Sequence, residues 1–463
     1  MTSYPTTQEL IDRKEQSKQI DKALKQIQSH LPFVGLEYYG IGGLGKSRIL
    51  DRVKEKCIEQ KQPFATIDLL NRGKQANRSG EIDILIRICD QLDHYFPVSR
   101  ARATLSTLLQ KGGRRDTREE EGKDKEKELG FRDTLMEFQM LLAGALDDKP
   151  LILILDNTEH CPEFLFNWLG NELVHPLVAE GQLSSVGVFL AGRGPRVEDS
   201  DWHKSLKHTV QSSRLNPLDF KATKDHLTAL PPEGRYQGSA REIYAISNGH
   251  PYSNEVIAHW LNTLGVSVEN VKGHKAEMAR RLYEEVIKQY ILADADPWIL
   301  PFVEVASAFH WFTPSLLMQA ISQYRPELAP QQPPQWYLAR ISDMRKRPYH
   351  LIQTGSVFYE LEPTLRKLLH TALVILNLTE MRAIHTMGKD QFEKELLEAR
   401  KIKVSTASIS TAPIIIIEII YHIAQVAMIN EVDIFASVQD GLQRLLGEHF
   451  DPKESRDLEV LNL

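Results

Sequence analysis

The chain has 463 residues, more than one hydrophobic core usually supports, so we expect roughly two to four domains. Its 56 basic and 62 acidic residues give a formal net charge of -6, which excludes binding to nucleic acid or anionic membranes by overall charge alone. The cysteines Cys57, Cys89 and Cys161 form no CxxC pair, and the polar start of the chain lacks the apolar core of a signal peptide. These features exclude a disulfide framework and a structural zinc site, and they predict a cytoplasmic protein.

The first part of the chain alternates between helical and strand patterns. Helices are expected at 8–27, 47–60, 82–92 and 131–146, and strands at 31–39, 63–69, 151–155 and 186–191. The last two strands are uninterrupted apolar runs, which are typical of strands buried on both faces of a parallel sheet. The pattern therefore predicts an α/β core, a parallel sheet flanked by helices, over residues 1–218.

Residues 111–128 interrupt this pattern with charge. Fourteen of these eighteen residues are charged, seven of each sign. Such a block buries too little apolar surface to fold alone, so it predicts an exposed, unstructured insertion. A binding role for it is the alternative.

From residue 219 onward the pattern is mainly helical. Residues 349–353 and 357–361 flank a Thr-Gly-Ser turn, which predicts a β-hairpin. Helices followed by a hairpin suggest a winged helix. We therefore expect a helical lid at 219–281, a winged-helix domain at 282–370 and a helical C-terminal region at 371–463.

One apolar stretch, residues 412–429, is about long enough to span a bilayer. Glu418, His422 and Gln425 interrupt it on one stripe of a helix and leave a broad apolar face opposite. This pattern favours a buried or partner-facing helix turned to water along that stripe, with membrane insertion as the alternative. Thr411 is expected as its N-cap and Pro413 in its first turn.

The segment between the first expected strand and the next helix carries the most specific motif. It matches G-x-x-x-x-G-K-[ST] in full, between a predicted strand and a predicted helix, and so predicts a P-loop NTPase core. In such a loop, backbone N–H groups converge on phosphates at a helix N-terminus, the lysine neutralises phosphate charge, and the serine hydroxyl is a Mg²⁺ ligand. The nucleotide-binding residues expected here are Gly40, Gly42, Gly43, Leu44, Gly45, Lys46 and Ser47.

Three further side chains follow the expected core strands. Asp156 ends an apolar strand, where a carboxylate helps to hold Mg²⁺, although a helix-capping Asp is the alternative. Glu159 is a candidate to orient the attacking water and Arg193 a candidate sensor of the γ-phosphate, and exposed surface residues are the alternative for both. With Lys46, these form the predicted catalytic set. His160 and Cys161 lack further ligands, which argues against a metal site there.

The order of these motifs resembles the STAND class of signal-transduction ATPases, which is related to the nucleotide-binding modules of plant disease-resistance and animal apoptotic proteins. The resemblance covers about residues 12–369. It rests on the P-loop, the strand ending in Asp156-Asn157, Arg193, the Leu-Asn-Pro-Leu segment at 215–218, the turn at 248–251 and the winged-helix pattern.

The resemblance implies ATP or ADP with Mg²⁺ as ligands, and it extends the expected site. Pro251 would pack near the adenine, and Arg13 would help to shape the base pocket. The sequence departs from the family at Glu362, where a histidine often senses the diphosphate, and at Asn157, where a second acidic residue is common. The second departure shifts any base role toward Glu159.

Three functions fit these observations. The first is an ATP-hydrolysing switch that controls self-association or recruits a separate effector, in bacterial defence or signalling. The alternative is a DNA-binding ATPase of the replication-initiator or transposition-regulator type, for which the basic run Arg345-Lys346-Arg347 before the hairpin gives a basis. The third is a nucleotide-binding scaffold without meaningful turnover.

Overall fold

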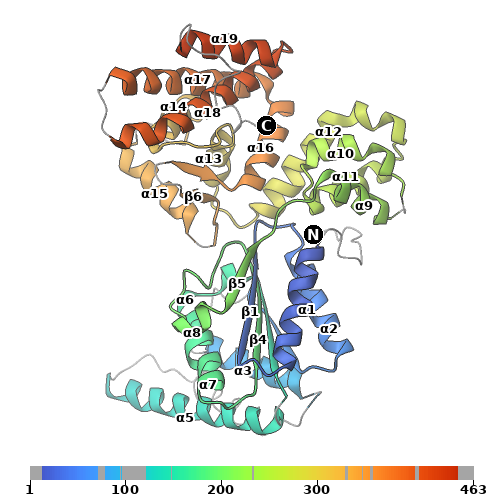
Figure 1. Cartoon of the computed structure of the whole chain (residues 1–463), viewed down its shortest axis with the longest axis vertical. Coiled ribbons are helices and arrows are strands. Elements are labelled where there is room, and N and C mark those ends of the chain that lie inside the picture. Colours follow the sequence, from blue (N-terminus) through green and yellow to red (C-terminus); the bar gives the residue numbers. More distant parts are fainter. Residues whose placement is uncertain are drawn as a thin grey trace. The chain divides into compact units, whose positions relative to one another are not determined.

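The computed structural model describes residues 13–70, 79–93, 95, 121–146, 149–231, 234–328, 332–346, 348–354, 358–401 and 406–446. The chain folds into two compact units, the first spanning Thr7–Asn216 and the second beginning at Pro217. The first unit contains a sheet with helices on both faces, and the second is mostly helical (Figure 1).

The first unit alternates helices and strands as the apolar patterning predicts. Its described elements are α1 (Lys14–Gln28), β1 (Phe33–Tyr39), α2 (Lys46–Glu59), β2 (Phe64–Asp68), α3 (Ser79–Leu92), α5 (Glu121–Leu146), β3 (Leu151–Asp156), η1 (Thr158–His160), α6 (Glu163–Trp168), η2 (Leu169–Val174), α7 (His175–Ala179), β4 (Val186–Gly192), α8 (Lys204–Lys207) and β5 (Val210–Arg214).

The five strands form one parallel sheet in the order β2-β3-β4-β1-β5. Strand β4 lies between β1 and β3, with Phe189 in register with Leu36 on one side and Ile154 on the other. The predicted α/β core is confirmed. Because all strands run in the same direction, the residues that follow β1, β3 and β4 lie together where the carboxyl ends of the strands meet, at one edge of the sheet.

Apolar packing holds helices against both faces of this sheet. Helix α1 buries Ile20, Leu24 and Ile27 on one stripe, and α1 and α2 lie along the same face (Figure 1). On the other face, a continuous core joins α3, α5 and α6 to side chains such as Leu153 and Leu155. Helices cover both faces of the sheet, so side chains on both sides of β3 are buried. This explains why five consecutive residues of β3 are apolar.

Two features of the first unit differ from the prediction. Strand β5 was not expected, because its sequence Val-Gln-Ser-Ser-Arg is polar and it lies at an edge of the sheet. In the charged block, residues 111–120 lie outside the described part of the chain, whereas 121–128 form the start of α5. The unstructured interpretation is therefore wrong for 121–128, because glutamate and lysine are strong helix formers.

The second unit contains helices and one short hairpin. Its described elements are α9 (Phe220–Ala229), η3 (Gln237–Ser239), α10 (Ala240–Ser247), α11 (Pro251–Thr263), η4 (Val268–His274), α12 (Lys275–Arg281), η5 (Leu282–Ile291), α13 (Ile299–Ala306), α14 (Pro314–Tyr324), α15 (Pro334–Arg345), β6 (Ile352–Thr354), β7 (Tyr359–Leu361), α16 (Pro363–Leu376), α17 (Leu378–Lys401), α18 (Thr406–Ile429) and α19 (Ile434–Leu446).

The predicted β-hairpin is present after three helices. Strands β6 and β7 pair antiparallel, and Phe312, between α13 and α14, forms a further bridge with Tyr359 of β7. Helices α13, α14 and α15 followed by this small sheet give the order of a winged helix. Glu362 then caps α16, because its carboxylate accepts the Leu365 N–H at 2.7 Å.

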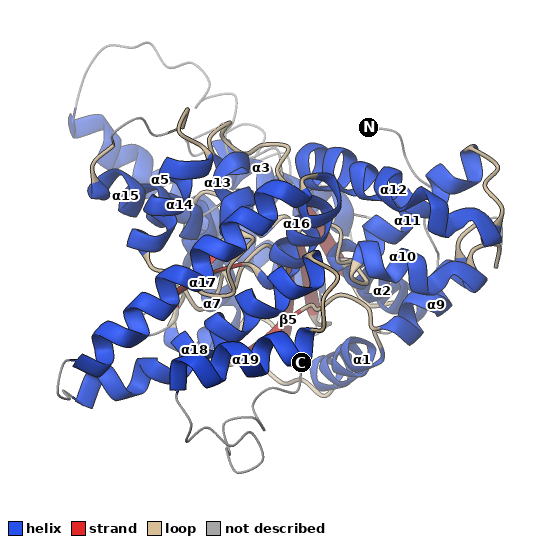
Figure 2. Cartoon of the chain, turned by 90° about the horizontal axis from the view of Figure 1, so that it is seen from above, coloured by secondary structure: helices blue, strands red, loops and turns tan. Residues whose placement is uncertain are grey.

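The apolar stretch near the C-terminus forms part of α18, which packs between α17 and α19 (Figure 2). The helix begins at Thr406, so Thr411 is not its N-cap and Pro413 lies beyond its first turn. Glu418 and His422 are fully buried, so the expectation that this stripe faces water is wrong. Among the described helices, none has both the length and the hydropathy needed to cross a membrane.

The buried stripe of α18 belongs to a polar cluster inside the second unit. His385 of α17 bonds through Nδ1 to His422 Nδ1 and through Nε2 to His370 Nε2 of α16, both at 2.9 Å. Glu418 lies 3.5 Å from His422 Nε2 and 3.4 Å from His310 Nδ1. The aligned ring nitrogens explain why these groups tolerate burial, since each hydrogen bond offsets part of the cost of desolvation.

Burial shifts the titration of the whole cluster. It lowers the pKa of His310, His370 and His422 to about 3 and that of His385 well below its ordinary value, and Arg366 adds to the effect on His310, His370 and His385. It raises the pKa of Glu418 to about 8, although Arg366 and the backbone N–H groups of His310 and Trp311 oppose this shift. Lys367 further lowers the pKa of His310, and the Tyr421 phenol next to the cluster has a raised pKa.

We expect the stability of the second unit to be greatest near pH 7, where the unfolded histidines together bind about as many protons as the folded Glu418 carboxyl. Below about pH 7 the unfolded histidines gain protons that the folded ones do not, so stability falls toward acid pH. Above it, the unfolded Glu418 is ionised while the folded carboxyl keeps its proton until about pH 8, so stability falls again toward alkaline pH. The four histidines outweigh the single carboxyl at acid pH.

Thermal unfolding measured across a pH series checks this expectation. Glu418→Gln should remove the net loss between pH 7 and pH 8, which is roughly half a kcal/mol. Glu398→Gln, an exposed position on α17, is the matched control and should keep the loss. An unfolding temperature that rises steadily up to pH 8 in the unsubstituted protein would contradict the assignment.

Candidate functional site

The P-loop forms the turn between β1 and α2, as the motif predicts. Gly45 precedes the helix with φ of +89°, a left-handed conformation that a side chain disfavours, and no side chain caps the helix. The first turn of α2 contains no acidic residue. The start of this helix therefore has the geometry and polarity of an anion-binding site.

Lys46 is the first residue of α2 and lies over the loop. Its ammonium group donates to the carbonyls of Gly40 and Ile41, both at 2.8 Å. Leu44 is fully buried and anchors the loop to the core, whereas Gly42, Gly43 and Ser47 are at least partly exposed. The loop thus keeps its backbone and its lysine at the edge of the sheet.

Asp156 ends β3 at the same edge. Its carboxylate accepts a hydrogen bond from the Ser47 hydroxyl, so the two predicted Mg²⁺ ligands are neighbours. Burial raises the pKa of Asp156, whereas the bonds from Ser47 and from the Asn157 backbone and the charge of Lys46 oppose the shift. A hydroxyl and a carboxylate are the hard oxygen ligands that Mg²⁺ prefers, so the residues present fit this ion.

Asn157 holds the backbone after β3 in an unusual conformation. Its φ is +57°, and its side-chain amide donates to Asp68 Oδ1 at the end of β2, at 2.8 Å. Asparagine tolerates this left-handed region better than most residues. The turn directs the chain into η1, where Glu159 is found.

Glu159 and Arg193 meet at the edge of the sheet. Arg193 Nε lies 3.5 Å from Glu159 Oε1, and His160 Nε2 lies 3.9 Å from the same oxygen. Glu159 is 7% exposed, and its buried Oε2 has no hydrogen-bond partner among the described residues. The alternative of an exposed surface Glu is therefore wrong, and Oε2 lies buried inside the first unit.

No family model matches the chain, and no curated protein matches it. Among solved structures, it is similar to a Walker-type ATPase, PABY2304 of Pyrococcus abyssi, with 15% identity, a TM-score of 0.49, and coverage of 79% of this chain and 98% of that one. It is also similar to the ORC2 protein of Aeropyrum pernix, solved as ADPNP-ADP complexes, with 14% identity, a TM-score of 0.46, and coverage of 81% and 96%.

The decisive observations are the strand order β2-β3-β4-β1-β5, the P-loop after β1 and the Asp156–Ser47 contact. The first unit is a P-loop NTPase core. The glycine-rich loop, its lysine and the serine–aspartate pair are the features of this core that can act on a nucleotide.

The two residues expected around the base lie in different units. In the P-loop NTPase core, the Nη2 atom of Arg13 donates to the carbonyls of Leu44 and Asn216, both at 3.0 Å, so Arg13 does lie beside the loop. Pro251 is the first residue of α11 in the second unit, after a turn that ends α10. The roles of both residues against the adenine stay predictions.

His160 and Cys161 directly follow Glu159 in the chain. Cys161 is buried and His160 partly exposed, and the described residues contain no group of three or more histidine, cysteine or acidic side chains arranged to hold a metal ion.

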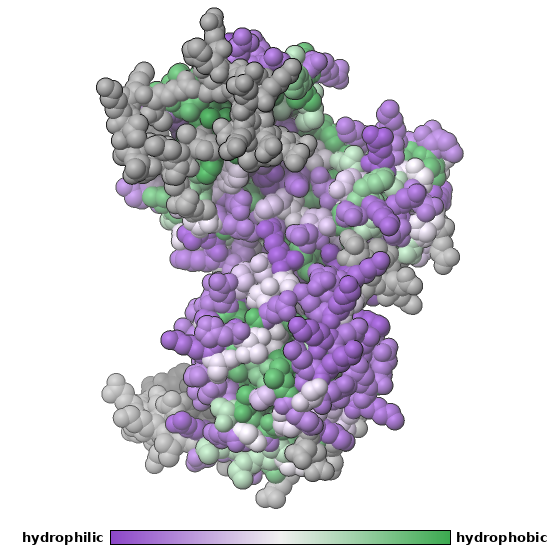
Figure 3. Space-filling model, viewed as in Figure 1, coloured by the Kyte–Doolittle hydropathy of each residue, from purple (hydrophilic) through white to green (hydrophobic). Residues whose placement is uncertain are grey.

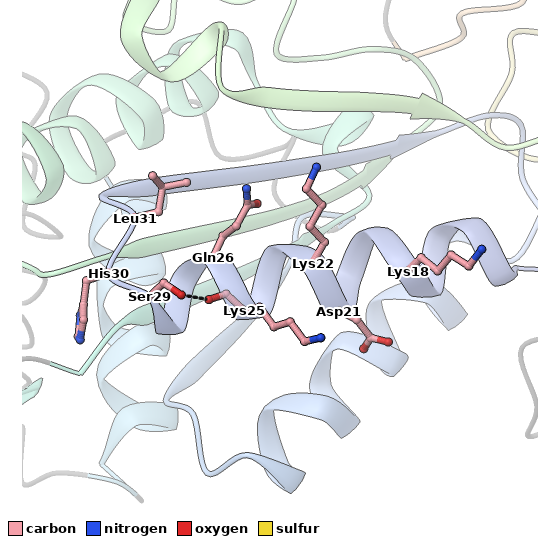
Figure 4. A pocket seen from close by; sticks show the side chains of 8 residues that line it. All are labelled: Lys18, Asp21, Lys22, Lys25, Gln26, Ser29, His30 and Leu31. Carbon is pink, nitrogen blue, oxygen red and sulfur yellow. Dashed lines mark hydrogen bonds between the residues drawn. The ribbon is translucent and has the colours of Figure 1, made fainter.

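A groove of about 690 Å³ runs along α1, away from the motif residues. Its lysines extend from the helix toward solvent, over a hydrophilic part of the surface (Figures 3 and 4). No P-loop residue lines it, so its size does not mark it as the nucleotide site. Its lining residues are Lys18, Asp21, Lys22, Lys25, Gln26, Ser29, His30 and Leu31.

Proposed function

We propose that the chain is an ATP-binding and ATP-hydrolysing switch whose nucleotide state controls assembly or partner recruitment. The observation that carries this proposal is the convergence of the P-loop Lys46, the Ser47–Asp156 pair and the Glu159–Arg193 pair at one edge of the sheet. Each has a physical role in transferring a phosphoryl group to water.

The roles follow from the positions. Lys46 and the start of α2 bind the phosphates. Ser47 and Asp156 would hold Mg²⁺, which would neutralise charge on the phosphate oxygens. Glu159 accepts a proton from the attacking water. Arg193, now paired with Glu159, supplies positive charge as the γ-phosphate departs.

A switch requires that ATP and ADP favour different states. The γ-phosphate carries charge that competes with Glu159 for Arg193, and this contact is absent with ADP. Coupling of about 1–3 kcal/mol is typical of such linkage and changes an assembly equilibrium by about 5- to 150-fold. We therefore expect ATP, more than ADP, to drive self-association or binding to a partner.

Mass photometry of the Glu159→Gln protein with ATP, with ADP and without nucleotide tests this expectation. A larger species should appear with ATP, and the Lys46→Ala protein is the matched control that should stay unchanged. A single monomer peak under all conditions, with nucleotide binding verified, would leave the assembly role without support.

DNA is the second candidate partner, because the winged-helix order in the second unit comes with exposed basic residues. Arg345 and Lys346, at the end of α15 and directly before the hairpin segment, are both exposed, and Arg347 lies outside the described residues. A cationic wing would contact phosphates and make binding weaken with salt. Fluorescence anisotropy with duplex DNA across a salt series, with the double variant Arg345→Ala/Lys346→Ala as comparison, separates this function from protein recruitment.

The two more specific interpretations differ in their support. The resemblance to the STAND class rests on motif order, and no described contact adds to it. A role in bacterial defence has no observation behind it in either unit. The ATP-dependent switch, acting on protein or on DNA, is therefore the function proposed.

A further inference from the structure

A glutamate lies in the middle of the central sheet, where an ionisable group is costly. Glu37 is in β1, between β4 and β5, and is 1% exposed. It belongs to no motif, and the apolar pattern around it predicts an ordinary buried strand. Since burial of an unpaired carboxylate is strongly unfavourable, its hydrogen bonds show what keeps it there.

Three donors converge on the Glu37 carboxylate. Its Oε1 accepts the backbone N–H groups of Arg196 at 2.7 Å and Val197 at 3.1 Å, and its Oε2 accepts the Ser212 hydroxyl at 2.6 Å. Burial raises the pKa of Glu37, and these three bonds oppose that shift. The carboxylate thus joins β1 to β5 and to the loop that follows β4.

That loop carries Arg193. Only Gly194 and Pro195 separate Arg193 from the anchored Arg196, and the ring of Pro195 fixes one of the intervening torsions. The Arg196 guanidinium holds the same loop from another side, since its Nη2 donates to the Cys161 carbonyl at 2.6 Å. Cys161 follows η1, the element that contains Glu159.

We propose that Glu37 is a positioning residue that holds Arg193 against Glu159 and the phosphate end of the nucleotide. The inference rests on the proposed ATPase function and adds a residue that touches neither nucleotide nor water. Glu37 acts by fixing the backbone three residues after Arg193. Without that anchor the loop moves, and Arg193 leaves its place.

Steady-state kinetics of the full-length chain test this role through two substitutions. Glu37→Met keeps the side-chain length but removes the acceptor, so kcat should fall by roughly ten- to a hundredfold, the effect of misplacing a group by about 1 Å. KM for ATP should stay within about twofold, because the P-loop is untouched. Glu37→Gln keeps an acceptor oxygen and should restore most of kcat.

A double-mutant cycle distinguishes positioning from a general structural defect. If Glu37 acts through Arg193, adding Glu37→Met to Arg193→Ala should cause no further loss of kcat. Multiplication of the two losses would overturn the proposal. Ser212→Ala is the matched control, since it removes the donor from β5 but leaves both loop bonds, and a loss equal to that of Glu37→Met would also overturn it.

These experiments distinguish failure of the proposed ATPase function from failure of the role of Glu37. If Glu37→Met does not fold, Glu37→Asp, which keeps the charge one methylene shorter, takes its place in the same cycle. An unsubstituted protein that does not hydrolyse ATP rejects the proposed function itself. Normal hydrolysis with a multiplicative cycle rejects only the role of Glu37.

Discussion

Replacing Lys46 with alanine is expected to remove most nucleotide binding. The ammonium group is the one motif cation placed at the start of α2, where it bonds the Gly40 and Ile41 carbonyls at 2.8 Å and is available to exchange them for phosphate oxygens. Charge-assisted bonds contribute about 1.5–3 kcal/mol each, so losing one lowers the affinity for ATP by roughly ten- to a hundredfold, and losing two lowers it by a hundredfold or more.

Isothermal titration with ATP and Mg²⁺ measures this loss. Lys54→Ala is the matched control, because Lys54 lies on the same helix but pairs with Asp51 at the surface. Its affinity should equal that of the unsubstituted protein. Unchanged affinity and unchanged hydrolysis in Lys46→Ala would show that the P-loop does not bind nucleotide.

The second large effect is expected at Glu159. Glu159→Gln keeps the size of the side chain and its burial but cannot take a proton from water. ATP should remain bound while hydrolysis falls by roughly a hundred- to ten-thousandfold, the usual range for loss of a general base. The substitution also weakens the contact with Arg193, which leaves that cation available to the γ-phosphate.

Phosphate release under single-turnover conditions measures the chemical step directly. Glu163→Gln, exposed at the start of α6, controls for a change of charge nearby and should hydrolyse normally. Normal turnover in Glu159→Gln would assign Glu159 a purely structural role in pairing with Arg193.

The α/β core could be predicted from the sequence, because apolar runs indicate buried strands and glycines indicate where the backbone needs conformations that side chains disfavour. The apolar runs of β3 and β4 and the glycines of the P-loop each reflect a local physical requirement, and both were read correctly. Strand β5 was missed because an edge strand needs no apolar run. The start of α18 was misplaced because Thr411 and Pro413 resemble a helix start, whereas the observed helix begins at Thr406.

Polar contacts between residues far apart in the chain could not be predicted from the sequence. Nothing near Glu37 indicates that its partners are Arg196 and Val197, more than 150 residues away along the chain. The stripe containing Glu418 and His422 was expected to face water, because its partner His385 lies on another helix, far away in sequence. His385 is in turn bonded to His370 of α16. Such partners become visible when the fold brings the elements together.

The two bonds of Arg13 have a mechanical consequence. A single nitrogen, Nη2, holds the carbonyl of Leu44 in the P-loop and the carbonyl of Asn216, the last residue of the first unit. Arg13 therefore links the P-loop to the residue at which the chain leaves the first unit. Any displacement of the Leu44 carbonyl must either stretch a hydrogen bond or pull Asn216 along with it.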